Sequence, residues 1–340
     1  MKTRICKWDN VKCLLIFSVV LGHFANQFAA ESMKMKSLSI FIYSFHMPLF
    51  IFLSGLLQKR WDGEKKFDWN KPLFYIILGY TLKFAIYGIK LVFGKNPTFH
   101  WFGDTGLPWY MFAMAAFLVI TYLLRKVNPK IVLPLWIAVA CAAGYVESIG
   151  SFLYLSRILV FFPFYYMGYH LNGKDVMEFT DLKPIKALSV LVISVVGYIS
   201  LFKIDRAYHY IRLLTGRNAY SLVHVSGGVG WQDRLLCYGL AICMGAAMIS
   251  LVPNRKLPVA GYIGQNTLQI YFWHRLVLYV IMYVNVAKML HSVVNDFWLH
   301  GILSIAIALT LVLSIKSFGK PIKFIKKKEQ NFVMTIASAL

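Results

Sequence analysis

Long apolar runs separated by short polar stretches recur along the whole chain. Each run has roughly 17–25 residues, the length that a helix needs to cross the hydrocarbon core of a bilayer. We expect about ten transmembrane helices, with no soluble domain before, between or after them. The pattern predicts an all-α polytopic membrane bundle that forms a single domain over residues 1–340. The expected spans are 11–30, 38–57, 72–94, 107–124, 131–149, 151–171, 184–203, 232–252, 260–284 and 297–315.

Composition supports a membrane protein. Of the 340 residues, 59% are hydrophobic and only 15% are charged, whereas soluble proteins have about 25% charged residues. The stretch before the first span is too lightly charged for a cleaved signal peptide, and no small-residue cleavage site follows that span. The cysteines lack metal-site spacing, and we expect them to be reduced and mostly buried, with no metal bound. They are Cys6, Cys13, Cys141, Cys237 and Cys243.

The net charge of +22 does not indicate a nucleic-acid partner, because the cations gather in alternate connecting segments. When the N-terminus is placed in the cytoplasm, most of the lysines and arginines outside the spans fall on the cytoplasmic side. This bias predicts cytoplasmic N- and C-termini and a multi-pass protein of the bacterial inner membrane. The basic stretch "FIKKK" at 324–328 then lies beside anionic lipid headgroups.

Four ionisable residues lie deep within four different expected spans. His23, His46, Arg157 and His274 all fall roughly 9–15 Å from the outer end of their spans at 1.5 Å per residue. Charged or titratable groups in lipid are costly and mark functional sites by default. Each also has a structural alternative: a histidine can bond a helix carbonyl, and Arg157 can form an ion pair with Glu147, its nearest acidic residue in sequence.

The first span carries a polar stripe. Lys12 and His23 are eleven residues apart, which is three helical turns plus about 20°, so both lie on one face. Asp9 precedes Lys12 by three residues and shares that face. The stripe therefore runs from the cytoplasmic edge toward the outer side, although Lys12 alone would also fit a side chain that snorkels to the headgroups.

Five stretches match a known family pattern in the right order. The D-x-x-K-x10-H arrangement of Asp9, Lys12 and His23 resembles the first-helix motif of the membrane acyltransferase-3 family. The remaining four resemble later family segments, particularly in the sugar O-acetylase branch related to fucose O-acetylases. They are "FHMPLFIFLSG" (45–55), "LPWYMFAMAAF" (107–117), "LSRILVFFPFYYMGY" (155–169) and "YIGQNTLQIYFWH" (262–274).

The resemblance implies transfer of an acyl group, most often acetyl, from cytoplasmic acetyl-CoA or another acyl-CoA to a hydroxyl of a cell-surface or lipid-linked glycan outside. Lys12 is expected to meet the donor phosphates, and Ser54 to line the donor tunnel. Many family members carry an Arg-x-x-Arg pair after the second helix. Here that region reads "KKFDWNKP", so Lys65, Lys66 and Lys71 are the candidate phosphate-binding residues instead. A fused extracytoplasmic hydrolase-like domain, present in some members, is absent from this sequence.

The buried histidines suit acyl transfer because histidine can act as a base near neutral pH. His23 is expected to be either the general base that activates the acceptor hydroxyl or a transient acyl carrier. His46 or His274 would orient it or shuttle the proton. Arg157 would stabilise the developing oxyanion or a neighbouring carboxylate.

The acceptor side is expected along the outer rim and in the outer segment 203–231, the longest predicted loop. Aromatic faces and arginine side chains suit sugars and acidic or pyrophosphate-linked glycans. A loop that only packs over the bundle, with aromatic residues in an interfacial belt, is the alternative. The candidate acceptor-binding residues are Trp109, Tyr110, Glu147, Arg206 and Arg212.

Other functions remain open at this point. The chain could transfer succinyl groups to an exported polysaccharide, or transport glycan intermediates, since buried charges also line transport pathways. A transporter would be expected to show inverted repeats, and none is visible in the sequence. A scaffold role in polysaccharide assembly leaves the shared depth of the ionisable groups unexplained. The expected partners are membrane lipids, the acceptor glycan, and either further copies of the chain or polysaccharide assembly proteins.

Overall fold

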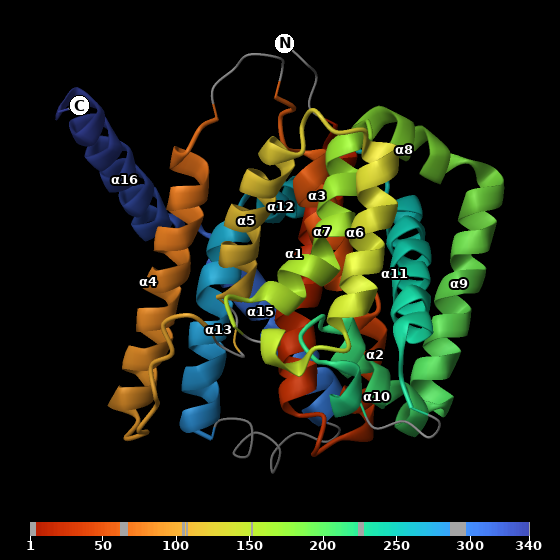
Figure 1. Ribbon diagram of the computed structural model, residues 1–340. Coiled ribbons are helices and arrows are strands. Elements are labelled where there is room, and N and C mark those ends of the chain that lie inside the picture. Colours follow the sequence, from red (N-terminus) through yellow and green to blue (C-terminus); the bar gives the residue numbers. More distant parts are fainter. Residues whose placement is uncertain are drawn as a thin grey trace.

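The computed structural model describes residues 5–61, 67–103, 106, 108–150, 152–223, 228–285 and 297–339. This part of the chain forms helices and their connections (Figure 1), with no β-strand and one isolated bridge between Gly103 and Phe152. The α-helices are α1 (Cys6–Gln27), α2 (Met33–Tyr43), α3 (His46–Leu56), α4 (Asn70–Val92), α5 (Trp109–Leu123), α6 (Pro129–Ala143), α7 (Leu155–His170), α8 (Gly173–Asp181), α9 (Lys183–Phe202), α10 (Ile204–Leu214), α11 (Trp231–Leu251), α12 (Pro258–Gln265), α13 (Thr267–Tyr283), α15 (Phe297–Ser314) and α16 (Lys320–Ala339). The predicted all-helical class is confirmed.

Several helices have the length and apolar character of membrane spans. Within the described residues, five segments meet both requirements: α1, α2 together with α3, α4, α9 and α11. A sixth is obtained if α15 and α16, which are bent by 65° at a short break, form one span. The helices α5 and α6 are apolar but shorter. These helices are consistent with a membrane bundle, and the total of about ten spans stays a prediction.

The predicted span 38–57 is broken in the middle. Helix α2 ends at Tyr43 and α3 begins at His46. The Ser44 hydroxyl donates to the Phe41 carbonyl (2.6 Å), and this bond satisfies an acceptor that the interrupted helix leaves open. Pro48 lies in the first turn of α3, where its missing amide hydrogen removes no helical bond. The break therefore places His46 at the start of a helix instead of in its interior.

The outer segment 203–231 is not the simple loop predicted from the sequence. It contains α10 and a short 3-10 turn, Tyr220–Leu222. Helix α10 is amphipathic and buries Ile211, Leu213 and Leu214 against the bundle. Polar residues that looked typical of a loop thus occupy the opposite face of a helix. This helix covers the end of the bundle where α1 finishes.

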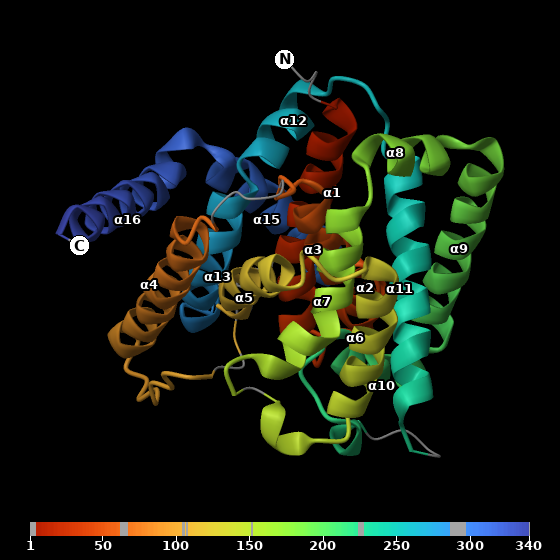
Figure 2. The same ribbon diagram turned by 45° about the horizontal axis from the view of Figure 1, so that its top comes forward.

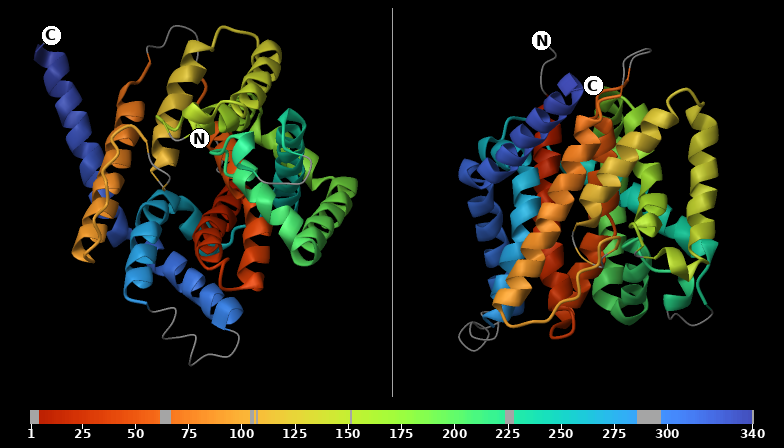
Figure 3. Two further views of the ribbon diagram at one scale, coloured as in Figure 1. Left: turned by 60° about the horizontal axis from the view of Figure 1, so that its bottom comes forward. Right: turned by 60° about the vertical axis from the view of Figure 1, so that its left-hand side comes forward.

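Helix α1 is the centre of the packing. It contacts α2, α3, α12, α13 and α15, and Figure 2 shows α12 lying along its first turns. A Cβ at Gly264 of α12 would collide with the Asp9 backbone carbonyl, so the two helices meet at backbone distance. Helix α9 lies at the periphery, and α16 packs beside α4 and extends away from the bundle (Figures 1 and 3).

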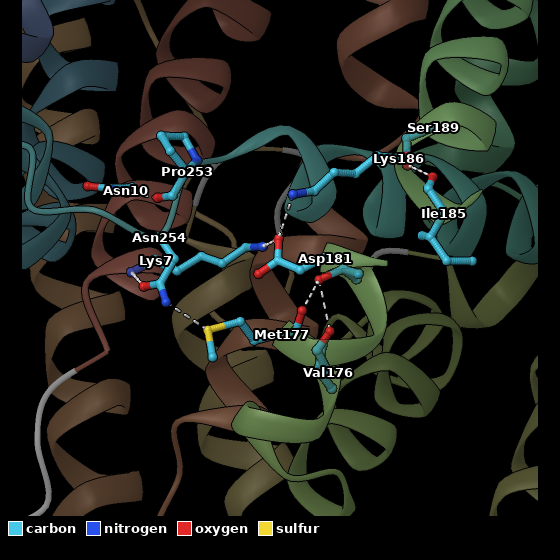
Figure 4. A network of polar contacts seen from close by, with 11 residues as sticks. Lys7, Asn10, Val176, Met177, Asp181, Ile185, Lys186, Ser189, Pro253 and Asn254 are labelled. Atoms are coloured by element: carbon cyan, nitrogen blue, oxygen red, sulfur yellow. Dashed lines mark hydrogen bonds and ion pairs between the residues drawn. The ribbon is translucent and has the colours of Figure 1, made fainter. Parts of the chain in front are cut away.

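A polar network fixes the first turns of α1 (Figure 4). The fully buried Lys7 ammonium forms an ion pair with Asp181 at the end of α8 (2.8 Å), and Asp181 also meets Lys186 of α9 (3.3 Å). The Lys7 backbone amide donates to the Asn254 side chain (3.3 Å), and the Asn10 amide donates to the Pro253 carbonyl (3.0 Å). The network joins three helices and the segment before α12, so it sets the position of α1 and of its polar stripe.

Candidate active site

Two chambers open inside the bundle, one toward each end of α1. The proximal chamber, near the start of α1, has a volume of about 500 Å³ and lies among α1, α3, α4, α5, α13 and α16. Its lining includes Lys12, Ser54, Lys71, Tyr110, Tyr271 and Lys326. The distal chamber, near the end of α1 and beneath α10, has a volume of about 390 Å³. Its lining includes His23, His46, Trp109, Arg157, Tyr271 and Arg275.

Tyr271 of α13 lines both chambers. On the proximal side its ring packs on that of Tyr110, with centroids 5.0 Å apart. On the distal side it meets the His274 ring, with centroids 5.8 Å apart. Tyr271 is itself buried. One tyrosine side chain therefore contributes to the wall of each chamber, and two molecules that enter from opposite ends can approach each other at this residue.

His23 and His274 form a stacked pair beside Tyr271. Their ring centroids are 5.3 Å apart, with an angle of 28° between the ring planes. His274 is fully buried and its Nδ1 lies 3.0 Å from the Ile270 carbonyl oxygen. Because a carbonyl only accepts, Nδ1 carries the hydrogen and Nε2 of the neutral ring has a lone pair. Nε2 has no hydrogen-bond partner among the described residues, whereas His23 is half-buried and faces the distal chamber.

His46 lines the distal chamber and is held by the same kind of hydrogen bond as His274. Its Nδ1 donates to the Ile42 carbonyl (2.8 Å) across the break between α2 and α3. Its ring also packs edge-on against Tyr43, with centroids 4.7 Å apart. The structural alternative raised by the sequence, a histidine that bonds an exposed helix carbonyl, is thus seen at His46. Because Nδ1 of the neutral His46 ring carries the hydrogen, Nε2 of His46 is the acceptor nitrogen, as it is in His274.

Arg157 is placed by neutral partners, so the structural alternative of an ion pair with Glu147 is not the one that the structure shows. The Arg157 Nε donates to the Thr215 carbonyl (3.3 Å), and the guanidinium lies 4.8 Å from the centre of the Trp109 ring. Glu147 lies in a 3-10 turn beyond the end of α6, where it is exposed and accepts a hydrogen bond from Ser221. Water can solvate a carboxylate there, so Glu147 has no need of a buried cation.

The neighbours Trp109 and Tyr110, predicted together as acceptor-binding residues, serve different chambers. Trp109 lines the distal chamber, whereas Tyr110 lines the proximal chamber. There the Tyr110 hydroxyl is hydrogen-bonded to Ser54 Oγ (3.0 Å), which itself donates to the Phe50 carbonyl (2.8 Å). Consecutive helical residues point about 100° apart, which accounts for the division.

The polar stripe of α1 contributes one residue to each chamber. Asp9 and Lys12 form an ion pair (2.7 Å), and the Gln265 amide lies 3.5 Å from the other Asp9 oxygen. Lys12 lines the proximal chamber and His23 the distal chamber. The shared face predicted from their spacing is thus the face that α1 presents to both cavities.

The other predicted cationic residues do not all lie at the two chambers. Lys71 lines the proximal chamber and Arg212 the distal chamber. Arg206 is exposed in a separate groove between α10 and α9 and does not reach the distal chamber. Lys65 and Lys66 lie outside the described residues. Within the described part of the chain, no group of three or more metal-ligand side chains is found.

Sequence reasoning missed three residues of the two chambers. Arg275 follows His274 within an apolar span and could have been found by the same rule that selected Arg157. Lys326 belongs to the basic stretch that was assigned to lipid headgroups, but it lines the proximal chamber. Tyr271 gave no signal, because a neutral aromatic residue is unremarkable in a chain with 20 tyrosines.

Residues 7–316 match the sequence profile of a family described as an acyltransferase domain, the acyltransferase-3 family. The chain belongs to the acyltransferase-3 family. It is also similar to the nodulation protein NolL of Mesorhizobium japonicum, with 24% identity over 291 residues that cover 79% of this chain and 75% of NolL. No solved structure matches the chain. Family membership and the apolar helices together make this acyltransferase-3 protein a membrane acyltransferase.

Proposed function

We propose that this acyltransferase-3 protein transfers an acetyl group from acetyl-CoA, bound in the proximal chamber, to a hydroxyl group of a glycan in the distal chamber. In this proposal the proximal chamber faces the cytoplasm of a bacterial cell and the protein lies in the inner membrane, which the distribution of cations supports. The observation that carries the proposal is that Tyr271 lines both chambers. Donor and acceptor can then react beside the His23 and His274 pair without either crossing the bundle.

The proximal chamber suits the donor because its lining offers cations to the donor phosphates, beside the two acidic residues Asp68 and Glu329. Lys12, Lys71 and Lys326 line it, and lysine ammonium groups bind phosphate as point charges. The hydrogen-bonded hydroxyls of Ser54 and Tyr110 lie in the same chamber. In this arrangement the phosphates of acetyl-CoA stay at the lysines, and the narrow pantetheine arm extends past the hydroxyl pair to Tyr271. The chamber volume falls in the range of about 300–1,000 Å³ that is common for ligand sites.

His23 is the proposed general base. Its half-buried imidazole stacks on His274 and faces the distal chamber. The ring takes the proton from the acceptor hydroxyl as that oxygen attacks the thioester carbonyl carbon. The carbon–sulfur bond then breaks, and the proton passes from His23 to the departing thiolate, so that CoA leaves as the thiol. The unprotonated Nε2 of His274 lies in the stacked ring beside His23 and serves to orient it.

Arg157 is the proposed oxyanion-stabilising group. It is 7% exposed and lines the chamber in which the hydroxyl attacks. A guanidinium in a poorly hydrated site interacts strongly with the negative charge that develops on the carbonyl oxygen. Trp109 and the Thr215 carbonyl hold the guanidinium in place, so little reorganisation is needed during the reaction.

The proposal is tested with full-length protein purified in detergent and acetyl-CoA labelled in the acetyl group. A panel of lipid-linked glycans and alkyl glycosides is supplied as acceptors, and both free CoA and labelled product are measured. We expect labelled, alkali-labile esters on at least one glycan, formed in equal amount to CoA. His23→Ala should abolish both the formation of labelled ester and the release of CoA. If CoA were released but no acceptor in the panel became acylated, the assignment as a glycan O-acetyltransferase would be contradicted.

O-succinyl transfer is a second candidate, favoured by one observation. The described residues that line the distal chamber include four arginines and no acidic side chain. Such a chamber suits the terminal carboxylate of a succinyl group as well as an anionic acceptor. Parallel reactions with succinyl-CoA and acetyl-CoA separate the two donors.

A further inference from the structure

The distal chamber has a strong excess of positive charge. Its lining includes Arg157, Arg212, Arg217 and Arg275, and it contains no Asp or Glu among the described residues. We infer that the chamber binds an anionic group, a carboxylate or a phosphate, carried by the acceptor. This inference rests on the proposed function only in taking the distal chamber as the acceptor site.

The contacts of the four guanidinium groups within the described chain are all with neutral groups. Arg157 donates to the Thr215 carbonyl (3.3 Å), and Arg212 Nη1 donates to the Leu222 carbonyl (2.6 Å). The side-chain oxygen of Asn218 accepts from Arg217 Nε (3.5 Å). Arg275 lies over the ring of Tyr279, 4.9 Å from its centre. Each guanidinium has five N–H donors, so these contacts use a small part of the hydrogen-bonding capacity.

Among these four arginines, two buried donor atoms lack a hydrogen-bond partner in the described structure. They are Nη1 of Arg157 and Nε of Arg275. Arg157 is 93% buried, since only 7% of its surface is exposed, and both residues line the distal chamber. A buried guanidinium without a counter-ion is unfavourable because it has lost hydration without gaining an opposite charge. Elsewhere in the molecule the buried Lys7 is neutralised by Asp181. An anion supplied by the ligand would do the same for Arg157 and Arg275.

The depth of the arginines favours the acceptor as the source of the anion. Arg212 is exposed on α10 and Arg217 is half-buried just after that helix, while Arg157 is buried deep in the chamber. The cations therefore extend from the outer mouth to the chamber floor. A ligand that enters from this mouth meets them in succession, whereas an acyl group that arrives past Tyr271 enters at the opposite end. Arginine binds both carboxylate and phosphate through paired hydrogen bonds, so either group on a glycan fits.

The test compares two acceptors that differ only at C6, where a carboxylate replaces a neutral hydroxymethyl group. Octyl β-D-glucuronide and octyl β-D-glucoside are titrated into full-length protein in nanodiscs of neutral lipid, and the two dissociation constants are measured. We expect the glucuronide to bind about tenfold more tightly, since hydrogen bonds to charged groups discriminate by about this factor. Arg275→Gln should reduce the preference to about twofold, and Arg275→Lys should retain part of it. Octyl glucoside 6-phosphate is the phosphate arm of the same titration.

Lys203→Gln is the matched control. Lys203 is exposed at the end of α9 and lies outside the distal chamber, so its loss should leave the preference unchanged. Equal affinity for charged and neutral glycosides, including absence of binding by both, would overturn the inference. A preference that Lys203→Gln reduces as much as Arg275→Gln would also overturn it, because general surface charge would then be the cause.

A transfer assay distinguishes the remaining outcomes. If the neutral glucoside is acylated well by succinyl-CoA and poorly by acetyl-CoA, and Arg275→Gln removes the difference, the anion belongs to the acyl group and the acceptor assignment is wrong. If the glucuronide binds preferentially but no acceptor is acylated, the proposed acyl transfer fails while the anion site stands.

Discussion

The His23 ring stacks on the His274 ring at a centroid distance of 5.3 Å, although the two residues come from opposite ends of the chain. His274 is immobilised by its hydrogen bond to the Ile270 carbonyl, whereas His23 faces the distal chamber. His274 is thus fully buried and held in place, whereas His23 lines a cavity that a ligand can enter. This difference supports the proposal that His23 is the reactive histidine and that His274 positions it.

The first prediction concerns this pair. His23→Ala should lower kcat for acetyl transfer by about 10²–10⁴-fold, the range attributed to a general base, and should leave KM for acetyl-CoA nearly unchanged. His274→Ala should lower kcat less, because it removes only the group that orients His23. Steady-state kinetics in detergent measure both values, and size-exclusion chromatography verifies that each variant is folded. Normal product formation by the His23 variant would disprove the base assignment.

The second prediction concerns the shared wall. Tyr271→Ala should join the two chambers, admit water to the thioester and increase hydrolysis relative to transfer. Tyr271→Phe keeps the ring and its contacts with Tyr110 and His274, so it should keep the two products coupled. The ratio of CoA released to acetylated glycan formed is the measurement. If the alanine variant retained a ratio of one, Tyr271 would not separate the chambers.

Much of this site is visible in the sequence because ionisable groups are rare in apolar segments. Lys12, His23, His46, Arg157 and His274 stand out for that reason. The structure places the first four in the lining of the two chambers and stacks His274 on His23. Their assignment to separate chambers was not predictable. It depends on side-chain direction at neighbouring positions and on Tyr271, a residue without charge.

The errors have physical causes as well. Glu147 was chosen as the partner of Arg157 by proximity in sequence, but the end of α6 at Ala143 carries it out to the surface. The outer segment was read as a loop because it is polar, and hydropathy alone does not detect an amphipathic helix that lies across the bundle end. The break near His46 is no such error, because the Met47-Pro48 pair indicates a broken helix whose exposed carbonyls His46 can satisfy, and the structure has the break between Tyr43 and His46.

The third prediction concerns the donor phosphates. Lys71→Gln should raise KM for acetyl-CoA about two- to fivefold, as expected for one exposed charge contact, and the effect should decrease as salt is added. S-acetyl-pantetheine lacks the phosphoadenosine group, so its KM should not change. Lys130→Gln removes an exposed lysine that does not line the proximal chamber and should behave as wild type. An equal rise in KM for both donors would exclude phosphate binding by Lys71.

The fourth prediction concerns the contact between α3 and α7. A Cβ at Gly168 would collide with the Phe52 carbonyl oxygen, and one at Gly55 would collide with that of Tyr165. Gly168→Ala should force the helices apart and lower stability by about 1–3 kcal/mol. Gly239→Ala in α11 meets no atom within 4 Å, and should be neutral or stabilising by up to about 1 kcal/mol. The apparent Tm values of Gly168→Ala and Gly239→Ala are measured in the same detergent and compared. Equal values would show that α3 and α7 are not in backbone contact.

The fifth prediction uses the polar network at the start of α1. Burial raises the pKa of Asp181, but its hydrogen bond and ion pair with Lys7, together with Lys186, outweigh that effect and hold the pKa below its usual 3.8. A carboxyl group with a lowered pKa in the folded state stabilises that state fully above the unfolded value, and the stabilisation is lost as the pH falls through the folded value. The wild-type Tm should therefore decrease below about pH 4.

Asp181→Asn should lower the Tm at neutral pH by an amount equivalent to about 1–2 kcal/mol, because the fully buried Lys7 then lacks a counter-ion. Its Tm should also depend less on pH in the acidic range, since the titrating group is gone. Glu178→Gln, at an exposed position of the same helix, should reproduce the wild-type profile. Because Lys7 anchors the helix that carries both Lys12 and His23, a loss of activity in Asp181→Asn that follows the loss of folded protein would identify the network as structural. Loss of activity in fully folded protein would instead show that the position of α1 sets the geometry of the two chambers.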